Sequence, residues 1–403
     1  MTDREILRSL AGRVRELAEL PVMAERRQLW ARHNALQPTR PLLMVSPEGS
    51  WPEVVPDSQL QCVDKQLRGW EWSLRSRIYQ AEVIQDDSII EPYADFSWHV
   101  QIGDYGVDVP YTQGDNRGSY VWEAPLKDLE RDLDRLHSRQ LSVNRVATQQ
   151  DLARGQEIFG DLLTVRLRGQ PWWTTGLTWE AVKLIGLEEL MLAMYDHPAE
   201  LHRLMAFLRD EMLNFIGWFE REGLLTPNNA GNQCGSGGIA CTTELAPSET
   251  ATRLRDYWGF AESQETVGVS PQMFEEFILP YQVPILDKFG LNYYGCCEGL
   301  EQRIDRILKH VPRLRRVSVA PKADQKIIAE KLAGRYVFVR KADPVPVCVD
   351  FNEAGIRSDL RRTLALAKGQ PLEVVLKDTH TVQGDPRRLS RWVEIAREEI
   401  ARV

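Results

Sequence analysis

Two adjacent cysteines followed by a glutamate place reactive side chains next to one another in the chain. Cys296, Cys297 and Glu298 come directly after the aromatic segment LNYY. A disulfide between neighbouring cysteines would close a strained ring, so the candidate roles for this pair are packing and metal binding. Thiolate, imidazole and carboxylate groups are the usual ligands of zinc, and a catalytic zinc site uses three of them and leaves one position open.

Further polar side chains follow four other apolar segments, at the points where strands are expected to end. They are Asn228, Asn229, Asn232 and Cys234 after LLTP, Lys322 and Asp324 after RRVSV, Arg340, Lys341 and Asp343 after YVFV, and Lys377, Asp378 and His380 after LEVVL. In parallel α/β barrels the active site lies at the carboxyl ends of the strands, which makes these groups candidates for one common site. Ordinary polar loop composition is the alternative explanation for any single loop.

The segment VVLKDTHT predicts a specific geometry if its strand stays extended. Successive side chains of a strand point to opposite faces, so Asp378 and His380 share one face and Lys377 takes the other. We expect Asp378 and His380 to point into the pocket, where His380 binds a metal or exchanges a proton. Asp378 would then orient His380 or act as an acid. In the alternative, Asp378 and Thr379 cap the final helix.

A zinc site is the prediction that unites these groups. Cys296, Cys297, Glu298 and His380 can converge if their two strands open at the same mouth. Packing behind the strand is the alternative for at least one of the two cysteines. Histidines in charged helical stretches, His33 among them, are expected on the surface instead.

Large aromatic and basic side chains in the same loops are candidates for substrate binding. Trp172 and Trp173 follow a predicted strand and can wall a pocket for a flat substrate, with plain packing as the alternative. The set predicted to bind substrate comprises Trp172, Trp173, Asn232, Lys322, Lys341 and Lys377. The three lysines in this set would hold an anionic group.

The elements that must position these residues alternate regularly. From residue 160 onward, apolar segments of strand length alternate with segments of helical periodicity, which is typical of a parallel sheet. Close to eight repeats favour an α/β fold with a single closed (β/α)8 barrel of the TIM type over an open doubly wound sheet. Apolar residues at helical spacing within 3–35 predict an N-terminal helical extension over 1–40, and the barrel domain then covers 41–403.

Composition and charge exclude several classes of protein. The 403 residues carry 50 basic and 58 acidic side chains, a net charge of −8 that offers no basic field for nucleic acid. The first residues lack the apolar core of a secretory signal, and no apolar run approaches the roughly 18 residues of a membrane span. Six cysteines are too few for a disulfide framework in a chain of this length. A cytoplasmic, reduced protein is therefore expected.

The segment SPQMFEEFILPYQVPILDKFG, followed by YYGCCEG, resembles a motif of the uroporphyrinogen decarboxylase superfamily. In that family a Ser-Pro helix precedes a strand that ends in His-x-Cys-Gly, and the resemblance covers most of the chain from about residue 40. The family implies a (β/α)8 barrel. In the branch related to corrinoid methyltransferases, the His and Cys of this motif and a later Cys bind zinc.

The chain departs from the family motif at several positions. Tyr294 stands where the motif has His, Cys296 falls on its Cys and Cys297 on its Gly. The later Cys falls on the last strand, where the resemblance implies that His380 replaces it. The segment SPEGSW occupies the place of the arginine-rich loop of the decarboxylases and contains no arginine, so binding of a porphyrinogen with four carboxylates is not expected.

The resemblance implies a zinc-dependent methyltransferase of the demethylase type. It would pass a methyl group from a small methylated substrate to a corrinoid protein or to tetrahydrofolate. The zinc would act as a Lewis acid on the atom that carries the methyl group, and Asp378 or Glu265 would protonate the leaving group. The expected partners are a small-molecule substrate, with a corrinoid protein and a second copy of the chain as further candidates.

Two other functions stay open at the level of the sequence. The first is a decarboxylase or other lyase that acts on a small carboxylate or a tetrapyrrole-like substrate. The second is a barrel that binds a ligand without transforming it. Stoichiometric zinc favours the methyltransferase, whereas a tightly bound polycarboxylate without metal favours the lyase.

Overall fold

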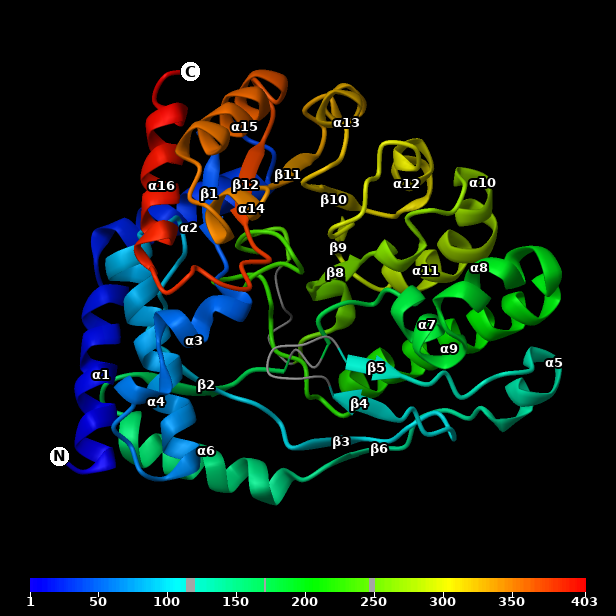
Figure 1. The fold of residues 1–403 in the computed structure, drawn as a ribbon. Helices are drawn as coiled ribbons and strands as arrows, with labels where there is room; N and C mark the ends of the chain where they lie inside the picture. The colour runs from blue at the N-terminus through cyan, green and yellow to red at the C-terminus, as the bar shows by residue number, and fades with distance from the viewer. Residues whose placement is uncertain (114–119, 170–171, 246–250) are drawn as a thin grey trace.

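A parallel sheet of six strands combines β1 from near the N-terminus with five strands from the carboxyl-terminal half of the chain (Figure 1). The computed structural model describes residues 1–113, 120–169, 172–245 and 251–403. The strand order is β1-β12-β11-β10-β9-β8. The bounds are β1 Leu42–Val45, β8 Trp258–Ala261, β9 Leu291–Tyr294, β10 Leu314–Val319, β11 Val337–Lys341 and β12 Leu372–Leu376. The predicted α/β class with a parallel sheet is confirmed, and the carboxyl ends of all six strands lie along one edge.

The remaining strands form three two-stranded sheets. Strand β2 (Tyr93–Phe96) pairs in parallel with β7 (Thr164–Leu167). The antiparallel pairs are β3 (Val100–Ile102) with β6 (Leu141–Val143) and β4 (Tyr111–Gln113) with β5 (Tyr120–Trp122). Within the described ranges, hydrogen-bonded ladders therefore do not join into the closed eight-stranded ring that the sequence predicted.

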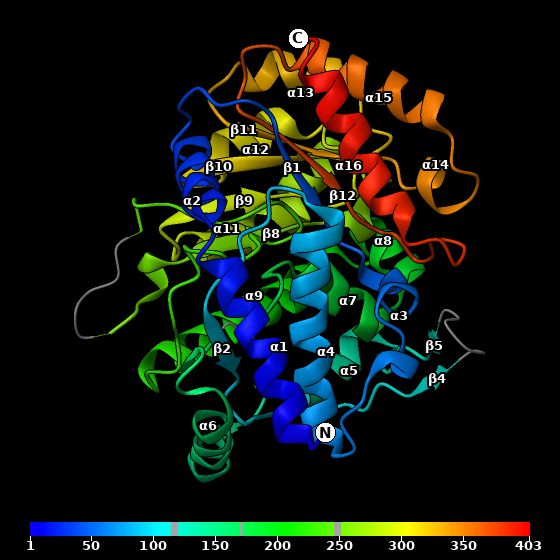
Figure 2. The same cartoon turned by 90° about the vertical axis from the view of Figure 1, so that its left-hand side faces the viewer.

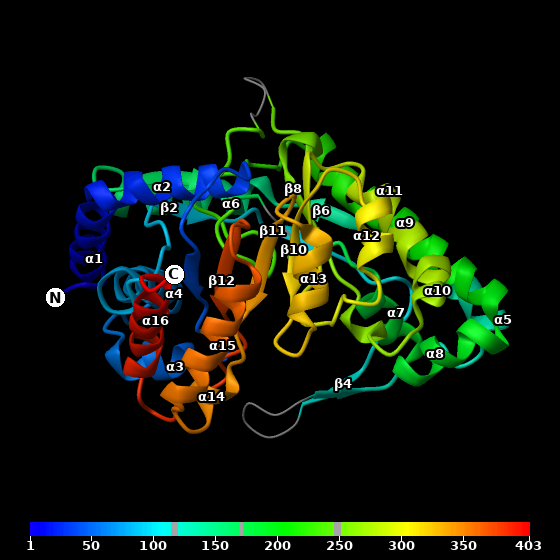
Figure 3. The same ribbon diagram turned by 90° about the horizontal axis from the view of Figure 1, so that it is seen from above.

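Helices cover the outer side of the six-stranded sheet. Figure 3 shows α11, α12, α13, α15 and α16 in an arc along it. In the first half of the chain the helices are α1 Asp3–Ala18, α2 Pro21–Asn34, α3 Trp51–Val54, α4 Lys65–Tyr79, α5 Leu129–Asp132, α6 Arg145–Phe159, α7 Thr178–Ile185 and α8 Leu187–Asp196. In the second half they are α9 Pro198–Arg221, α10 Pro271–Met273, α11 Leu279–Leu286, α12 Ile304–His310, α13 Gln325–Leu332, α14 Val345–Cys348, α15 Glu353–Leu366 and α16 Arg387–Ile400. No helix in the described ranges combines the length and the apolar character needed to cross a lipid bilayer.

The N-terminal helices α1 and α2 pack against later parts of the chain. Helix α1 runs beside α4 (Figure 2), and its apolar face packs into a core with α4, α6, β2 and β7. Helix α2 sends Trp30 into a different core, which lies on the inner face of the six-stranded sheet. The division into an extension over 1–40 and a barrel over 41–403 stays a prediction.

Strand alternation sorts the sheet into two faces. In β12, Val374 and Leu376 face the outer helices, and Val375 lies in the core on the opposite, inner face. Glu373 shares the parity of Val375 and therefore belongs to the inner face as well. The same rule places Arg316 of β10 there. A parallel sheet that is buried on both faces thus carries the charged side chains of Glu373 and Arg316 on its inner face.

A glycine-rich loop, residues 232–241, packs against this inner face. A Cβ on Gly238 would lie 2.2 Å from the Trp30 ring, and one on Gly235 would lie 2.4 Å from Phe260. Gly235 also has φ +52, a left-handed conformation that favours glycine. The loop therefore needs glycine at both positions in order to pass between the aromatic rings.

An interior ion pair fixes the loop to the sheet. Glu373 bonds Arg316 and accepts a hydrogen bond from the Gly238 N–H at 2.8 Å, and His33 Nε2 lies 3.2 Å from Glu373. The three side chains are fully buried. His33 is thus an interior residue, and its prediction as a surface histidine was wrong. The charge of Arg316 stabilises the carboxylate of Glu373, whose pKa falls to about 2 although burial opposes this.

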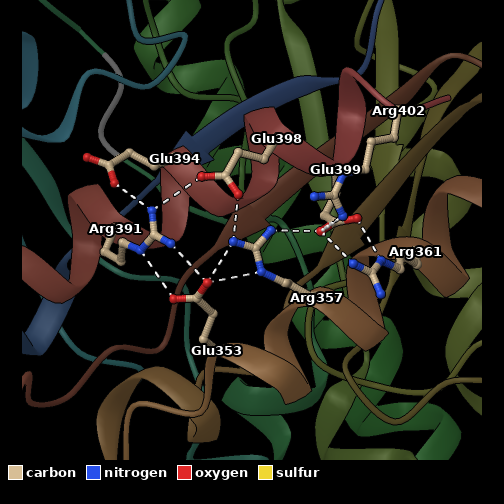
Figure 4. Close-up of polar contacts among 8 residues, drawn as sticks. All are labelled: Glu353, Arg357, Arg361, Arg391, Glu394, Glu398, Glu399 and Arg402. Carbon is tan, nitrogen blue, oxygen red and sulfur yellow. Dashed lines mark hydrogen bonds and ion pairs between the residues drawn. The ribbon is translucent and has the colours of Figure 1, made fainter.

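Helices α15 and α16 are joined by a network of charged side chains (Figure 4). The Glu399 carboxylate is buried, and it accepts hydrogen bonds from Arg357 at 2.8 Å and Arg361 at 2.7 Å. Arg402 is a third partner at 3.0 Å. The network closes the outer layer next to β12 and lies far from the strand ends that carry the candidate site.

Candidate functional site

The two cysteines lie at the carboxyl end of β9 in different environments. Cys296 is buried and Cys297 is exposed, yet their sulfur atoms are only 3.4 Å apart. The Glu298 carboxylate accepts hydrogen bonds from the backbone N–H of Cys296 at 2.8 Å and of Ser263 at 2.9 Å. Glu298 therefore shapes the turn that presents the two thiols.

Two lysines from neighbouring strands place positive charge beside the thiols. Lys341, at the end of β11, is fully buried and donates a hydrogen bond to the Ser236 carbonyl in the glycine-rich loop. The Lys377 ammonium, just after β12, lies 3.9 Å from the Cys297 sulfur and 3.0 Å from Asp378. The Cys297 sulfur lies 3.4 Å from the other Asp378 oxygen.

These contacts make the thiol pair unusually acidic. The hydrogen bond from Cys297 lowers the pKa of Cys296 to about 7 against the effect of burial, and the charges of Lys377 and Lys341 act in the same direction. The same hydrogen bond and burial raise the pKa of Cys297. The pair therefore loses one proton near neutrality and keeps the other. Burial lowers the pKa of Lys341 to about 8, and the charge of Cys296 opposes that shift.

A cavity of about 380 Å³ opens beside the exposed thiol. It is lined by Cys297, Glu298, Gln264, Glu265 and Val267. Glu265 accepts a hydrogen bond from the Thr178 hydroxyl at 2.6 Å, which fixes its carboxyl group on the cavity wall. The residue predicted as an acid is thus brought to the same cavity as the thiol pair.

A buried glutamate lies next to this cavity. Burial, followed by repulsion from Glu265 and Glu298, raises the pKa of Glu262 well above its usual range. The surroundings of Glu262 therefore favour its protonated form. It follows β8, a strand that the sequence analysis missed, and so it was absent from the predicted site.

A second cavity, of about 420 Å³, is lined by the two tryptophans that were predicted to wall a pocket. Trp172, Trp173 and Asn232 line it together with Arg168, Asp95 and Gln233. Trp173 packs edge-on against Phe260 of β8, with ring centres 5.2 Å apart. The structure thus brings these three predicted substrate-binding residues into one cavity, separate from the one beside Cys297.

The end of β12 differs from the predicted geometry. The strand ends at Leu376 and Asp378 has φ +58, so the alternation that would place Asp378 and His380 on one face does not continue. His380 is exposed, and its imidazole makes no hydrogen bond to any described residue. Asp378 lies against Lys377 and Cys297 as described above. Because α16 begins only at Arg387, Asp378 and Thr379 do not cap it either.

Glu48 is a further residue of the site. Its carboxylate accepts a hydrogen bond from the Asp378 N–H at 2.8 Å and lies 3.7 Å from the Lys377 ammonium. Glu48 follows β1, so the rule that functional groups follow strand ends could have found it. Lys322, in contrast, is exposed and pairs with Asp343 at 2.6 Å, apart from the thiols.

The residues present do not fit the predicted zinc site. The part of the chain that the structure describes contains no group of three or more His, Cys, Asp and Glu side chains placed to share a metal ion. Glu298 already accepts two backbone N–H groups, and His380 is exposed. The ammonium groups of Lys341 and Lys377 beside the thiols would repel a divalent cation. Zinc binding stays a prediction.

Comparisons with known proteins give a fold and no family. The structure is similar to that of a methyltransferase from Methanosarcina mazei over 93% of this chain and 98% of that one, with a TM-score of 0.52 and 11% sequence identity. At that identity the likeness concerns the fold alone. No family model matches the sequence, and no curated protein matches it.

Proposed function

We propose that the protein is a methyltransferase in which the exposed thiol of Cys297 receives the methyl group. The observation that carries this proposal is the pair of sulfur atoms 3.4 Å apart that shares one proton near neutrality, next to a cavity of about 380 Å³. The likeness in fold to a methyltransferase supports it. The Cys297 sulfur, with the Cys296 thiolate beside it as a base, is the strongest nucleophile among the side chains that line this cavity.

The methyl transfer can be written with the groups at hand. Cys296 carries the negative charge of the pair and takes the proton of Cys297 as the Cys297 sulfur attacks the methyl carbon. The sulfur–carbon bond forms, and the bond from the methyl carbon to its donor atom breaks with its electron pair on that atom. A methylated ammonium or sulfonium donor leaves as a neutral amine or sulfide and needs no proton. The carboxyl group of Glu265 faces such a donor.

The lysines keep the pair reactive after each turnover. The positive charges of Lys341 and Lys377 favour the thiolate over the thiol and hold it in place between β11 and β12. A second acceptor then removes the methyl group from Cys297 and restores the thiol pair. We propose a corrinoid protein or tetrahydrofolate as that acceptor, in keeping with the resemblance described above.

The test is a search for S-methylcysteine. The purified protein is incubated with tetramethylammonium, glycine betaine, S-methylmethionine or 5-methyltetrahydrofolate, and peptide mass spectrometry locates any added methyl group. We expect one methyl group on Cys297, none in Cys297→Ser, and a strong loss of the rate in Cys296→Ser. Cys241→Ser, which changes a half-buried cysteine elsewhere, is the control and keeps the wild-type rate. Absence of S-methylation and of methyl transfer to cobalamin or tetrahydrofolate with every donor contradicts the proposal.

A carboxy-lyase is a second candidate, because two lysines converge on the site. Lys341 is fully buried, and its pKa is lowered to about 8. Lys377 directly follows β12, the strand that pairs with β11. Ammonium groups in a buried position hold the carboxylate of a substrate. Release of carbon dioxide from a small polycarboxylate, lost in Lys341→Met and retained in Cys297→Ser, would favour this function over methyl transfer.

A further inference from the structure

The second cavity, of about 420 Å³, is lined by side-chain amides that make no hydrogen bond to the residues the structure describes. Asn232 is only 5% exposed, and its side-chain amide makes no hydrogen bond to any described residue. Its backbone carbonyl accepts from the Ala240 N–H at 2.7 Å, which fixes the position of the residue in the glycine-rich loop. The Asn232 amide lines the cavity and is not among the fully buried polar atoms that lack a partner, so it is accessible there to hydrogen-bond a ligand.

Two further residues, Gln233 and Trp173, line the cavity beside Asn232. The side-chain amide of Gln233 lines the same cavity and likewise has no hydrogen bond to a described residue. Trp173 is 50% exposed and contacts Phe260 with its rings at 68°, which leaves a face of the indole open to the cavity. An open indole face next to two free amides favours a flat ring that stacks on the tryptophan and offers polar atoms along its edge.

The lining of the same cavity includes a fixed positive group. Arg168 donates to Asp95 at 2.8 Å through one of its terminal nitrogens, and Arg166 holds the other oxygen of Asp95 at 2.5 Å. The Arg168 side chain remains 33% exposed and keeps further N–H donors for an anion. Asp95 is neutralised by the two arginines and holds Arg168 in place. An anionic tail on the ring would therefore find a preformed partner.

We propose that this cavity binds a planar nitrogen heterocycle whose edge carries adjacent N–H and C=O groups and whose tail is anionic. The amides of Asn232 and Gln233 pair with that edge, the ring stacks on Trp173, and Arg168 binds the tail. The 2-amino-4-oxopyrimidine edge has this pattern, and it occurs in pterins and in guanine. The inference goes beyond methyl transfer at Cys297 and does not depend on it, because it concerns a different cavity.

Calorimetric titration of the full chain tests the proposal with two probes, folic acid and guanosine monophosphate. p-Aminobenzoate, a flat anion without the amide edge, is the negative probe. We expect at least one of the two probes to bind, with a loss of affinity of tenfold or more in Trp173→Ala and in Asn232→Leu. Gln37→Leu changes a glutamine that lines an unrelated cavity at the amino ends of the strands, and it leaves binding unchanged.

Thermal melting separates loss of binding from loss of fold. Because the Asn232 amide makes no hydrogen bond to a residue within the described ranges, Asn232→Leu is expected to keep the wild-type melting temperature while it removes binding. Binding of folic acid alone assigns the site to a pterin, and binding of guanosine monophosphate alone assigns it to a purine nucleotide. The proposal is overturned if neither probe binds, if p-aminobenzoate binds equally well, or if Asn232→Leu and Trp173→Ala bind as the wild type does. None of these outcomes bears on S-methylation of Cys297, which is measured separately.

Discussion

At the scale of single residues, the candidate site depends on a proton shared between two sulfur atoms. The buried Cys296 provides a place for the charge between two ammonium groups, and the exposed Cys297 provides access to the cavity. Neither residue alone would combine a low pKa with access to the cavity, because burial by itself raises the pKa of a thiol. The acidity is a property of the pair.

Replacement of Cys296 by serine is expected to shift the reactivity of its neighbour. In the wild type, alkylation of Cys297 by iodoacetamide should accelerate as the pair loses its proton near pH 7. In Cys296→Ser the midpoint should move up toward the ordinary thiol value of about 8.5, because the acceptor of the proton is gone. Mass spectrometry of the alkylated peptide over a series of pH values gives the midpoints. A profile for Cys297 that is the same in both proteins would contradict the shared proton.

The sequence predicted the reactive residues better than their partners. Cys296 and Cys297 were identified because two adjacent thiols follow an expected strand. His380 was placed in the pocket with Asp378 by a strand alternation that stops at Leu376. The positive φ of Asp378 cannot be foreseen from the residue type, since aspartate adopts that conformation in a minority of cases. The burial of His33 depends on Glu373, which is far away in the chain.

At the scale of elements, the contact between α15 and α16 relies on charge as well as on apolar packing. Glu399 is the buried acceptor of three arginines, and hydrogen bonds from Arg361 and Arg357 lower its pKa to about 2 although partial burial opposes this. Glu394, in the same network, is exposed and contacts only Arg391 among the network arginines (Figure 4). A comparison of substitutions at these two glutamates therefore tests whether burial determines how much an ion pair contributes to the stability of the fold.

Replacement of Glu399 by glutamine should destabilise the protein in a pH-dependent way. A carboxyl group whose pKa is lower in the folded state stabilises the fold above its unfolded pKa of about 4.5, and this contribution is lost as the pH falls toward 2. The difference in melting temperature between wild type and Glu399→Gln should therefore be largest near pH 7 and should shrink below about pH 4.5. Glu394→Gln, the control, should melt as the wild type does. A difference for Glu399→Gln that is independent of pH would show that the carboxylate charge is not responsible.

Strands were predicted well where an apolar run of β-branched residues stands alone, as in β11 and β12. Strand β8, Trp258–Ala261, was missed because its four residues include a glycine and lie among aromatic and charged neighbours. The segment at 224–226, expected as a strand end, does not form a strand in the structure. Short segments of this kind become strands only when a neighbour supplies hydrogen bonds, which no local pattern reveals.

At the scale of the whole molecule, one interior ion pair links segments from the entire length of the chain. Arg316 and Glu373 come from two strands, Gly238 from the glycine-rich loop, and His33 from α2. The pair holds the loop that in turn supplies the carbonyl partner of Lys341. Its loss should therefore affect the global stability of the protein rather than one element.

Replacement of Glu373 by glutamine should lower the free energy of unfolding by ~3–5 kcal/mol, because it leaves the Arg316 charge buried without a counter-charge. The double variant Glu373→Leu with Arg316→Met should lose less, since it removes both charges together. Lys331→Met, which breaks an exposed ion pair with Asp305, should cost only ~0–1 kcal/mol. Chemical denaturation of the three variants measures these values. A cost for Glu373→Gln as small as that for Lys331→Met would mean that the interior pair adds little.

The pairing of β1 with β12 has a consequence for how cells make this protein. A ribosome releases the chain from its N-terminus, so β1 leaves the exit tunnel long before the strand that it pairs with in the sheet. Until β12 has been translated, the backbone N–H and C=O groups of β1 lack the partners that the finished sheet gives them, and an unpaired strand edge is prone to join with other chains. The nascent chain therefore completes its sheet only after β12 has left the ribosome, and until then the open edge of β1 exposes the growing polypeptide to aggregation.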